Sequence, residues 1–429
     1  MEHLRMEDQG MDSLFIDHDR CIGCVRCMMA CPTKAVRVRQ RKAVILDDLC
    51  IDCGVCVTAC ERGAIVPRID TFEDLSRKFK VKIALPSPVL YSQFGGNILP
   101  NDILRALKAV GFDDVCDEAY ICEVVGFLIE RYTSEHKTAG LPFISSLCPV
   151  VIRLIQKRFH DLIPLIIPIE APREVAAREL KQRYAKKLGV SEEEIAVVYI
   201  TPCSAKINAI KVPPTRKRSH LDSAIAIKEV YGLIVRELME MKDRELVDEE
   251  FYLRASGAGF SWAMSGGEIA EFGFTSSIAV SGIRNVIRIL EDIDRGRFKN
   301  LDCIALRACE EGCLGGNLTV ENRYIAKMKL LRLVEMFGKS PRFDKEKLLQ
   351  AYKEHSTFER EPHAIKSVPI DTRRDSAITK LNQVSDLMRG LGKIDCGACG
   401  SPDCRTFAED VVCEQALAEQ CPFWTGSKP

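Results

Sequence analysis

The feature that most constrains this chain is a pair of closely spaced four-cysteine runs near its N-terminus. The first is Cys21-x2-Cys24-x2-Cys27-x3-Cys31, and the second repeats that spacing as Cys50-x2-Cys53-x2-Cys56-x3-Cys60. The x2–x2–x3 spacing lets one loop bind three corners of a cubane 4Fe–4S cluster, while the fourth cysteine follows on a short helix. The doubled run therefore predicts two such clusters in one small domain.

This arrangement resembles the bacterial two-cluster ferredoxins, in which the fourth cysteine of each run binds the cluster of the other run. The resemblance implies two ligand sets, which are Cys21, Cys24, Cys27 and Cys60, and Cys50, Cys53, Cys56 and Cys31. The similar stretches 16–24 and 46–53 support an internal repeat. A zinc ribbon is the alternative, but doubled runs of this spacing are not typical of zinc sites.

Four more cysteines occupy three short segments that lie far apart in the chain. They are Cys148, Cys203, Cys309 and Cys313. Three of the four stand directly beside Pro or Gly, where the backbone turns and can approach a ligand closely. Four thiolates are sufficient for a 4Fe–4S cluster, and their wide separation places that cluster inside a folded domain. Ordinary buried cysteines, which behave as small apolar residues, are the alternative.

The segments 145–149, 201–206 and 308–316 resemble the three signature motifs of the iron-only (FeFe) hydrogenases. The resemblance covers roughly residues 80–340, and the stretches 84–87, 111–117 and 257–262 also match the family in order. It implies that the four cysteines hold one 4Fe–4S cluster and that Cys313 also bridges to a diiron centre with carbonyl and cyanide ligands. The stretch 315–322 is most similar to the branch regarded as sensory or regulatory.

The same resemblance implies roles for three further residues. Lys206 and Ser87 would donate hydrogen bonds to the cyanides, and Trp262 would form one wall of the pocket. A solvated lysine at the start of a helix is the alternative for Lys206, and plain core packing is the alternative for Trp262.

The chain also departs from the family at several positions. Leu147 stands where the high-turnover enzymes carry a proton-relay cysteine, and Thr201 and Arg307 replace family methionines. Ala209 replaces an expected glutamate. Loss of general acid–base help costs roughly 100- to 10,000-fold in rate, so any H2 turnover is expected to be slow. Arg307 is expected either to pair with Glu310 or Glu311, or to mark an empty diiron pocket.

Short apolar runs alternate with helical periodicity from residue 80 to 340. Strands are predicted at 81–85, 195–200, 278–282 and 303–307. Cysteine-bearing loops directly follow two of them, as expected for a site at the carboxyl ends of strands. We predict an α/β hydrogenase-like core of two lobes around a central cluster. An α+β ferredoxin-like domain would precede it, and a small helical iron–sulfur domain would follow.

The predicted domains are 1–70 for the ferredoxin part, 80–340 for the core, 341–391 for a linker with helices, and 392–429 for the last domain. This last domain carries Cys396, Cys399, Cys404 and Cys421. It resembles a small 4Fe–4S domain attached to many redox proteins, and structural zinc is the alternative. The remaining cysteines are interpreted as core residues, namely Cys116, Cys122, Cys303 and Cys413.

Composition also bears on the compartment of the protein and on the kind of partner it binds. Twenty cysteines exceed what packing alone requires, and neither an apolar leader nor an uninterrupted apolar run of about 18 residues occurs. We therefore expect a reducing cytoplasmic compartment and no membrane span. Because 61 basic residues balance 61 acidic residues, nothing in the charge favours a nucleic-acid partner.

Four cubane clusters would form an electron wire, so a redox partner protein or other subunits of a redox complex are expected, with a signalling protein also open. Three functions follow. The first is slow or regulatory H2-linked electron transfer, and the second is a non-catalytic electron-transfer subunit without the diiron centre. The third is a signalling module in which the clusters serve mainly to hold the shape.

Overall fold

The computed structural model describes residues 14–136, 140–242, 252–270, 276–340, 352, 356–366 and 370–426. The chain divides into two compact units. The smaller unit combines Met1–Arg68 with Ile365–Pro429, and the larger unit comprises Ile69–Ala364. The two predicted iron–sulfur domains at the ends of the sequence therefore belong to one unit, and the predicted core forms the other.

The ferredoxin-like part is built from two similar halves. Its elements are β1 (Leu14–Ile16), α1 (Arg26–Ala30), β2 (Val36–Arg39), β3 (Lys42–Ile45), α2 (Val55–Ala59) and β4 (Ile65–Pro67). β1 pairs antiparallel with β4, and β2 pairs antiparallel with β3. Val25 and Gly54, the residues before α1 and α2, both have left-handed backbone, with φ of 59° and 71°. The equivalent turns reflect the repeated cysteine spacing.

The C-terminal part is a small helical domain. It contains α15 (Arg374–Gly390), α16 (Cys404–Val412) and the short 3₁₀ helix η5 (Ala418–Gln420). Val384, Leu387 and Phe407 bury a common core between α15 and α16. Helix α15 thus packs with the last domain, although it falls within the sequence range that we assigned to a linker. Part of that range, including residues 341–350, lies outside the described residues.

The larger unit has an α/β core with two parallel sheets. One sheet has the order β6-β5-β8-β9, formed by β5 (Val81–Pro86), β6 (Asp114–Val115), β8 (Ile195–Thr201) and β9 (Ser223–Ala226). The other has the order β10-β11-β7, formed by β7 (Phe143–Ile144), β10 (Ser277–Ser281) and β11 (Cys303–Arg307). The four strands predicted from the sequence correspond to β5, β8, β10 and β11.

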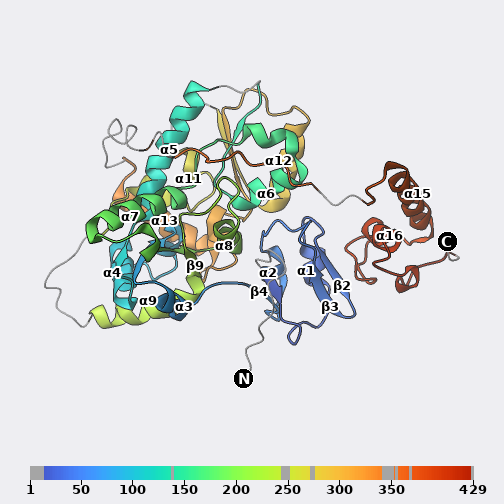
Figure 1. The fold of residues 1–429 in the computed structure, drawn as a ribbon, viewed down its shortest axis with the longest axis horizontal. Coiled ribbons are helices and arrows are strands. Elements are labelled where there is room, and N and C mark those ends of the chain that lie inside the picture. Colours follow the sequence, from blue (N-terminus) through green and yellow to red (C-terminus); the bar gives the residue numbers. More distant parts are fainter. Residues whose placement is uncertain are drawn as a thin grey trace. The chain divides into compact units, whose positions relative to one another are not determined.

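Helices cover both faces of the four-stranded sheet (Figure 1). On one face, α4 (Pro100–Val110) and α9 (Ile227–Lys242) pack against Ala196, Val198 and Ile200 of β8. On the other face, α5 (Glu118–Glu135) and α7 (Pro172–Leu188) pack against the alternate residues of β8. A strand buried on both sides reads as a continuous apolar run, which is why β8 was recognisable from the sequence.

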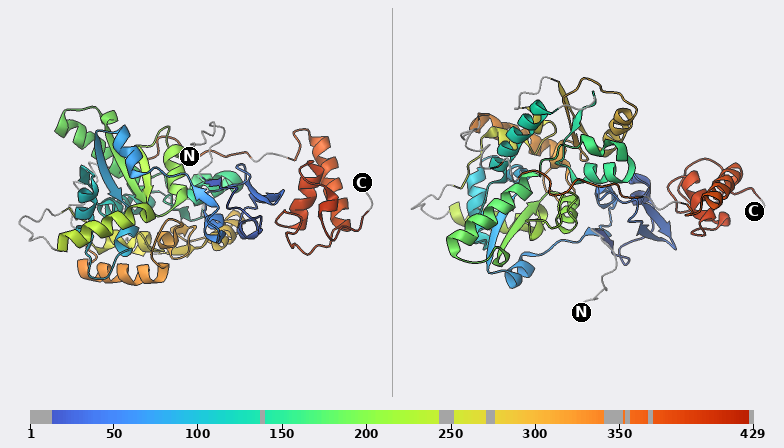
Figure 2. Two further views of the ribbon diagram at one scale, coloured as in Figure 1. Left: turned by 90° about the horizontal axis from the view of Figure 1, so that it is seen from below. Right: turned by 45° about the horizontal axis from the view of Figure 1, so that its top comes forward.

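The larger unit contains further helices. Helix α13 (Arg323–Phe337), orange in Figure 2, packs against α10 (Gly257–Ser261). The other elements are α3 (Phe72–Lys78), α6 (Pro149–Arg158), α8 (Ser204–Lys211), α11 (Gly267–Ala270), α12 (Ile283–Asp294), η1 (Pro88–Ser92), η2 (His160–Leu165), η3 (Glu192–Glu194) and η4 (Gly312–Gly315).

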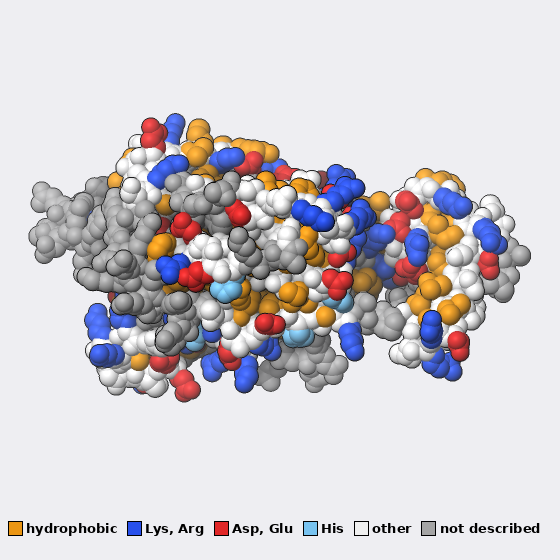
Figure 3. All heavy atoms as spheres, turned by 90° about the horizontal axis from the view of Figure 1, so that it is seen from above, with side chains coloured by type: hydrophobic (Ala, Val, Ile, Leu, Met, Phe, Trp, Pro, Cys, Tyr) orange, Lys and Arg blue, Asp and Glu red, His pale blue; other side chains and the backbone are white. Residues whose placement is uncertain are grey.

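On the face drawn in Figure 3, basic and acidic side chains are interspersed, in keeping with their equal numbers in the sequence. Among the described residues, none of the helices combines the length and the apolar character that a membrane span requires.

Candidate functional site

The four core cysteines lie on loops that follow strands of the two sheets. Cys203 comes just after β8 and directly precedes α8, and Cys148 directly precedes α6, whose first residue is Pro149. Cys309 follows β11, and Cys313 lies in η4. Helix N-termini carry partial positive charge, so the starts of α6 and α8 favour an anionic group beside these two cysteines.

Hydrogen bonds tie the loop of Cys313 to the loop of Cys203. Ser204 N donates to Asn317 Oδ1 at 3.1 Å, and Asn317 Nδ2 donates to Ser204 Oγ at 3.0 Å. Gly316 lies so close to Pro202 that a Cβ would come 2.3 Å from the Pro202 carbonyl oxygen. The sequence motif supplies glycine here because no side chain fits.

Three of the four predicted ligands influence one another electrostatically. Burial raises the pKa of Cys203 to about 11; Lys206 opposes this shift, whereas Cys313 and Cys148 add to it. Cys309 lies on the same short loop as Cys313. All twenty cysteines fall within the described residues, and none of them forms a disulfide. In the described part of the chain, no three Cys, His, Asp or Glu side chains form a group suited to a single metal ion.

A cavity of about 30 Å³ lies beside Cys313. The three residues predicted to serve a diiron group all line it. The full lining consists of Ser87, Pro88, Glu118, Cys122, Leu147, Pro172, Arg173, Lys206, Trp262, Ala263, Arg307 and Cys313. Three of these side chains are cationic and one is a carboxylate, so the cavity is suited to an anionic occupant.

Lys206 is the centre of a buried polar chain. Its ammonium Nζ lies 3.1 Å from Tyr199 Oη, which donates a hydrogen bond of 3.0 Å to Glu118 Oε2. Burial alone would lower the pKa of Lys206, but Cys313, Tyr199 and Glu118 outweigh that effect and raise it. The lysine is only 7% exposed, so the interpretation of a solvated helix-start lysine is wrong.

Arg307 forms a buried ion pair with Glu268, and their side chains are 6% and 2% exposed. Its Nη1 also lies 3.8 Å from Cys313 Sγ. The expected pairing of Arg307 with Glu310 or Glu311 is therefore wrong. Those two carboxylates point to helix α13 instead, where Glu310 pairs with Arg323 and Glu311 pairs with Lys327, each at 2.6 Å.

Sequence reasoning missed several side chains of this site. Glu118, Arg173, Tyr199 and Glu268 carry no motif, and only their folded positions bring them to the cavity or its neighbours. Arg173 Nε and Glu268 Oε1 are buried without a hydrogen-bond partner among the described residues. Cys122 was interpreted as a core residue; it is 3% exposed and belongs to the core, but it also lines the cavity.

The cysteines of the ferredoxin-like part fall into two neighbouring groups. Burial, and to a lesser extent Cys24, Cys60 and Cys21, raise the pKa of Cys27. Burial, followed by Cys53, Cys50 and Cys31, raises the pKa of Cys56. Backbone N–H groups point at four of the sulfurs, namely Ala35 at Cys31, Ala43 at Cys21, Asp52 at Cys50 and Ala64 at Cys60, with distances of 3.2–3.4 Å. Such donors favour the thiolate form that a cluster needs.

The C-terminal part gathers its own four cysteines around a small cavity. Cys396, Cys399, Cys404 and Cys421 all line a space of about 10 Å³, and Cys413 is not among its lining residues. Burial is the main cause that raises the pKa of Cys399, and the neighbouring Cys421 and Cys396 raise it further.

The comparison with protein families agrees with this geometry. The model described as "Iron only hydrogenase large subunit, C-terminal domain" matches residues 80–317. A model for a 4Fe-4S dicluster domain matches residues 13–61, and a model for an Fe–S cluster domain matches residues 391–423.

Several known proteins are similar to this chain. The NADP-reducing hydrogenase subunit HndD of Solidesulfovibrio fructosivorans is 26% identical over 306 residues, which cover 63% of this chain and 52% of that protein. Iron hydrogenase 1 of Clostridium pasteurianum is 24% identical over 332 residues, covering 69% and 56% of the two chains. The chain spans about half the length of these relatives.

A shorter similarity points in another direction. A cytosolic Fe-S cluster assembly factor NAR1 homolog of Schizosaccharomyces japonicus is 39% identical over 66 residues, which cover 15% of this chain and 13% of that protein. Among solved structures, HydA(deltaEFG), described as revealing stepwise [FeFe]-hydrogenase H-cluster assembly, matches with a TM-score of 0.50. The match has 16% identity and covers 69% of this chain and 96% of that one, so it shows the fold alone.

Proposed function

Because this chain belongs to the iron-only hydrogenase large-subunit family, we propose that it is an electron-transfer protein that links its iron–sulfur clusters to slow or regulatory turnover of H2 and protons. It is an FeFe-hydrogenase-like iron–sulfur protein. The proposal assigns one 4Fe–4S cluster to Cys148, Cys203, Cys309 and Cys313, two clusters to the ferredoxin-like part and one to the C-terminal part.

The buried ammonium of Lys206 is the observation that carries the H2-linked role. A buried cation is costly unless an anion compensates it. Lys206 lies at a cavity that Ser87 also lines, beside Cys313. Lys206 and Ser87 would hold the anionic ligands of a diiron group by hydrogen bonds, and Trp262 would keep water out. When bound, such a group would supply the cleavage of the H–H bond.

Leu147 limits the rate in this proposal. It lines the cavity and is 4% exposed, and its side chain has no group that can carry a proton. A missing general acid or base lowers turnover by roughly 100- to 10,000-fold. A slow protein of this kind is suited to reporting H2 or redox state to a partner. The similarity to a subunit of an NADP-reducing hydrogenase supports partner subunits. A reducing compartment such as the cytoplasm suits a chain whose described cysteines form no disulfide.

A non-catalytic electron-transfer subunit is the second candidate, and one observation favours it. The Arg307–Glu268 pair places a fixed guanidinium beside Cys313. The short similarity to an iron–sulfur assembly factor is compatible with a role without H2 chemistry.

Infrared spectroscopy after maturation with a diiron assembly system separates the two candidates. The H2-linked role predicts bands from metal-bound CO and CN, together with low H2 oxidation with an artificial acceptor. A Lys206→Ala variant should lose these bands while it keeps the iron of its 4Fe–4S clusters. If the unaltered protein lacks these bands, the H2-linked role is wrong and only the electron-transfer role remains.

The Leu147→Cys variant tests the rate limit. If proton delivery is limiting, it should raise H2 turnover by roughly 100-fold or more. Leu147→Ala is the matched control, because it opens the same space without a proton carrier. Equal turnover of the two variants would contradict the proposed limit.

A further inference from the structure

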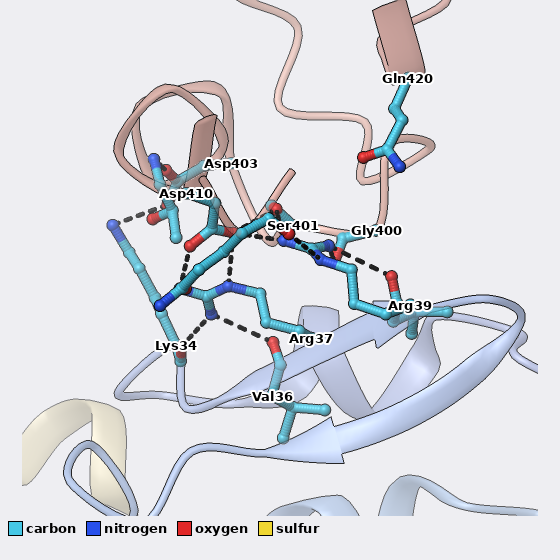
Figure 4. Close-up of polar contacts among 12 residues, drawn as sticks. Lys34, Val36, Arg37, Arg39, Gly400, Ser401, Asp403, Asp410 and Gln420 are labelled. Atoms are coloured by element: carbon cyan, nitrogen blue, oxygen red, sulfur yellow. Dashed lines mark hydrogen bonds and ion pairs between the residues drawn. The ribbon is translucent and has the colours of Figure 1, made fainter. Parts of the chain in front are cut away.

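Within the smaller unit, a buried ion cluster joins the C-terminal domain to the ferredoxin-like domain (Figure 4). Asp410 of α16 accepts hydrogen bonds from Arg37 Nε at 2.7 Å and from Arg37 Nη2 at 3.2 Å. Arg39 Nη2 and Ser401 Oγ each donate to the same carboxylate at 2.6 Å. The side chains of Arg37 and Asp410 are 7% and 5% exposed. A two-pronged, buried contact of this kind fixes geometry in a way that a surface ion pair does not.

The two backbones also meet directly. Val38 N of β2 donates to the Gly400 carbonyl at 2.9 Å, and Arg39 Nη1 donates to the same oxygen at 2.6 Å. A Cβ at Gly400 would come 1.9 Å from the Val38 carbonyl oxygen. Glycine is therefore required at position 400 for this contact, and it follows immediately after the predicted ligand Cys399.

The contact involves the cluster-binding loops themselves. Gly397 lies between Cys396 and Cys399, and a Cβ there would come 2.9 Å from both Met28 Cε and Met29 Sδ. These two methionines lie on α1 (Arg26–Ala30), within the segment from Cys27 to Cys31. That segment carries one predicted ligand of each ferredoxin-type cluster. The loop that carries Cys396 and Cys399 therefore packs against the segment from Cys27 to Cys31, which carries ligands of both ferredoxin-type clusters.

We propose that the C-terminal domain is a built-in redox partner of the ferredoxin-like domain, docked through the Arg37/Arg39–Asp410 cluster so that one electron passes between its 4Fe–4S cluster and a ferredoxin-type cluster. The donor cluster is oxidised by one electron, the acceptor cluster is reduced by one, and no bond or proton is exchanged. The inference rests on the proposed function, since both domains must carry 4Fe–4S clusters. It makes the last cluster in the sequence a neighbour of the first two.

The test compares the full-length reconstituted chain with the Arg37→Gln/Arg39→Gln variant. Arg41→Gln is the matched control, because Arg41 is an exposed arginine next to the same strand. Arg39→Gln alone, which keeps the Arg37–Asp410 pair, covers the case in which the double variant folds poorly. Three readouts are recorded, namely iron per chain, hydrogen exchange at the Val38 amide, and the electron-spin relaxation of the reduced clusters.

The proposal predicts slow Val38 exchange in the unaltered chain and in the control, and exchange at least about tenfold faster in the double variant. Spin relaxation of the C-terminal cluster should be enhanced by its neighbours in the unaltered chain and slower in the double variant, at equal iron content. Unchanged Val38 exchange in the double variant would overturn the docking. Faster exchange with unchanged relaxation would overturn the electron exchange. If the iron content does not fall on Cys399→Ser, the C-terminal domain holds no cluster at this site. That result would contradict this part of the proposed function and not the docking.

Discussion

The ferredoxin-like part and the hydrogenase-like core both bring predicted cluster ligands together, but over very different distances along the chain. The eight predicted ligands of the first lie between Cys21 and Cys60, and backbone N–H groups of neighbouring residues point at four of the sulfurs. The four predicted ligands of the second lie between Cys148 and Cys313, on loops that only the two sheets bring together. The first site is encoded locally, whereas the second depends on long-range packing and on buried polar contacts such as the Arg307–Glu268 ion pair.

Removal of a ligand should give the largest effect in both regions. Cys53→Ala and Cys203→Ala should each cost about four irons per chain, because each disrupts a different cubane. Iron analysis and EPR of the reconstituted variants measure this loss. Cys303→Ala is the control, since Cys303 is a buried core cysteine that is 1% exposed. Full iron content in Cys203→Ala would show that Cys203 binds no cluster, and it would contradict the comparison between the two regions.

Loss of one partner of the Arg307–Glu268 pair should destabilise only the core. Arg307→Met leaves a buried carboxylate unpaired and should lower the free energy of unfolding by about 3–5 kcal/mol. The double variant Arg307→Met/Glu268→Gln should recover most of that loss. The control is Arg323→Met, because the exposed Arg323–Glu310 pair should contribute about 1 kcal/mol or less. Urea unfolding followed by a core-specific signal measures the difference, and an equal loss in Arg323→Met would contradict it.

Acid should weaken the core through His220. Burial, with a contribution from Arg216, lowers the pKa of His220 from 6.5 to about 4. Between these values the unfolded chain binds more protons than the folded chain, so stability falls as the pH drops from about 6.5 to 4. His220→Gln should reduce this loss, which is measured as the change in thermal midpoint between pH 7 and pH 5. The exposed His160→Gln serves as control, and an equal change in both variants would refute the assignment.

The smallest effect is expected at Glu61, which follows the last ferredoxin ligand. Glu61 forms an ion pair with Arg26, and the two side chains are 75% and 55% exposed. Glu61→Gln should therefore change stability by about 1 kcal/mol or less and leave the iron content unchanged. Thermal unfolding of the reconstituted protein provides the check. A large loss would mean that the local region also depends on charge networks.

The sequence predicted best what is encoded over short distances. The ferredoxin spacing, the doubly buried strand β8 and the loops after β8 and β11 follow from local patterns that have direct physical causes. It failed for Arg307, whose partner Glu268 lies 39 positions away without any motif to mark it. It also gave no sign that Asp410 contacts Arg37, 373 positions away. Pairings of this kind depend on the packed fold, which no local pattern records.

The central claim is that four distant cysteines hold one cluster inside the core. Its most direct test is iron analysis and EPR of a full-length chain in which the twelve ferredoxin and C-terminal ligand cysteines are replaced by serine. The account predicts about four irons per chain and the signal of a single 4Fe–4S cluster, both lost on the further change Cys203→Ala. A chain that binds no iron after reconstitution, or that keeps its iron when Cys203 is removed, would contradict it.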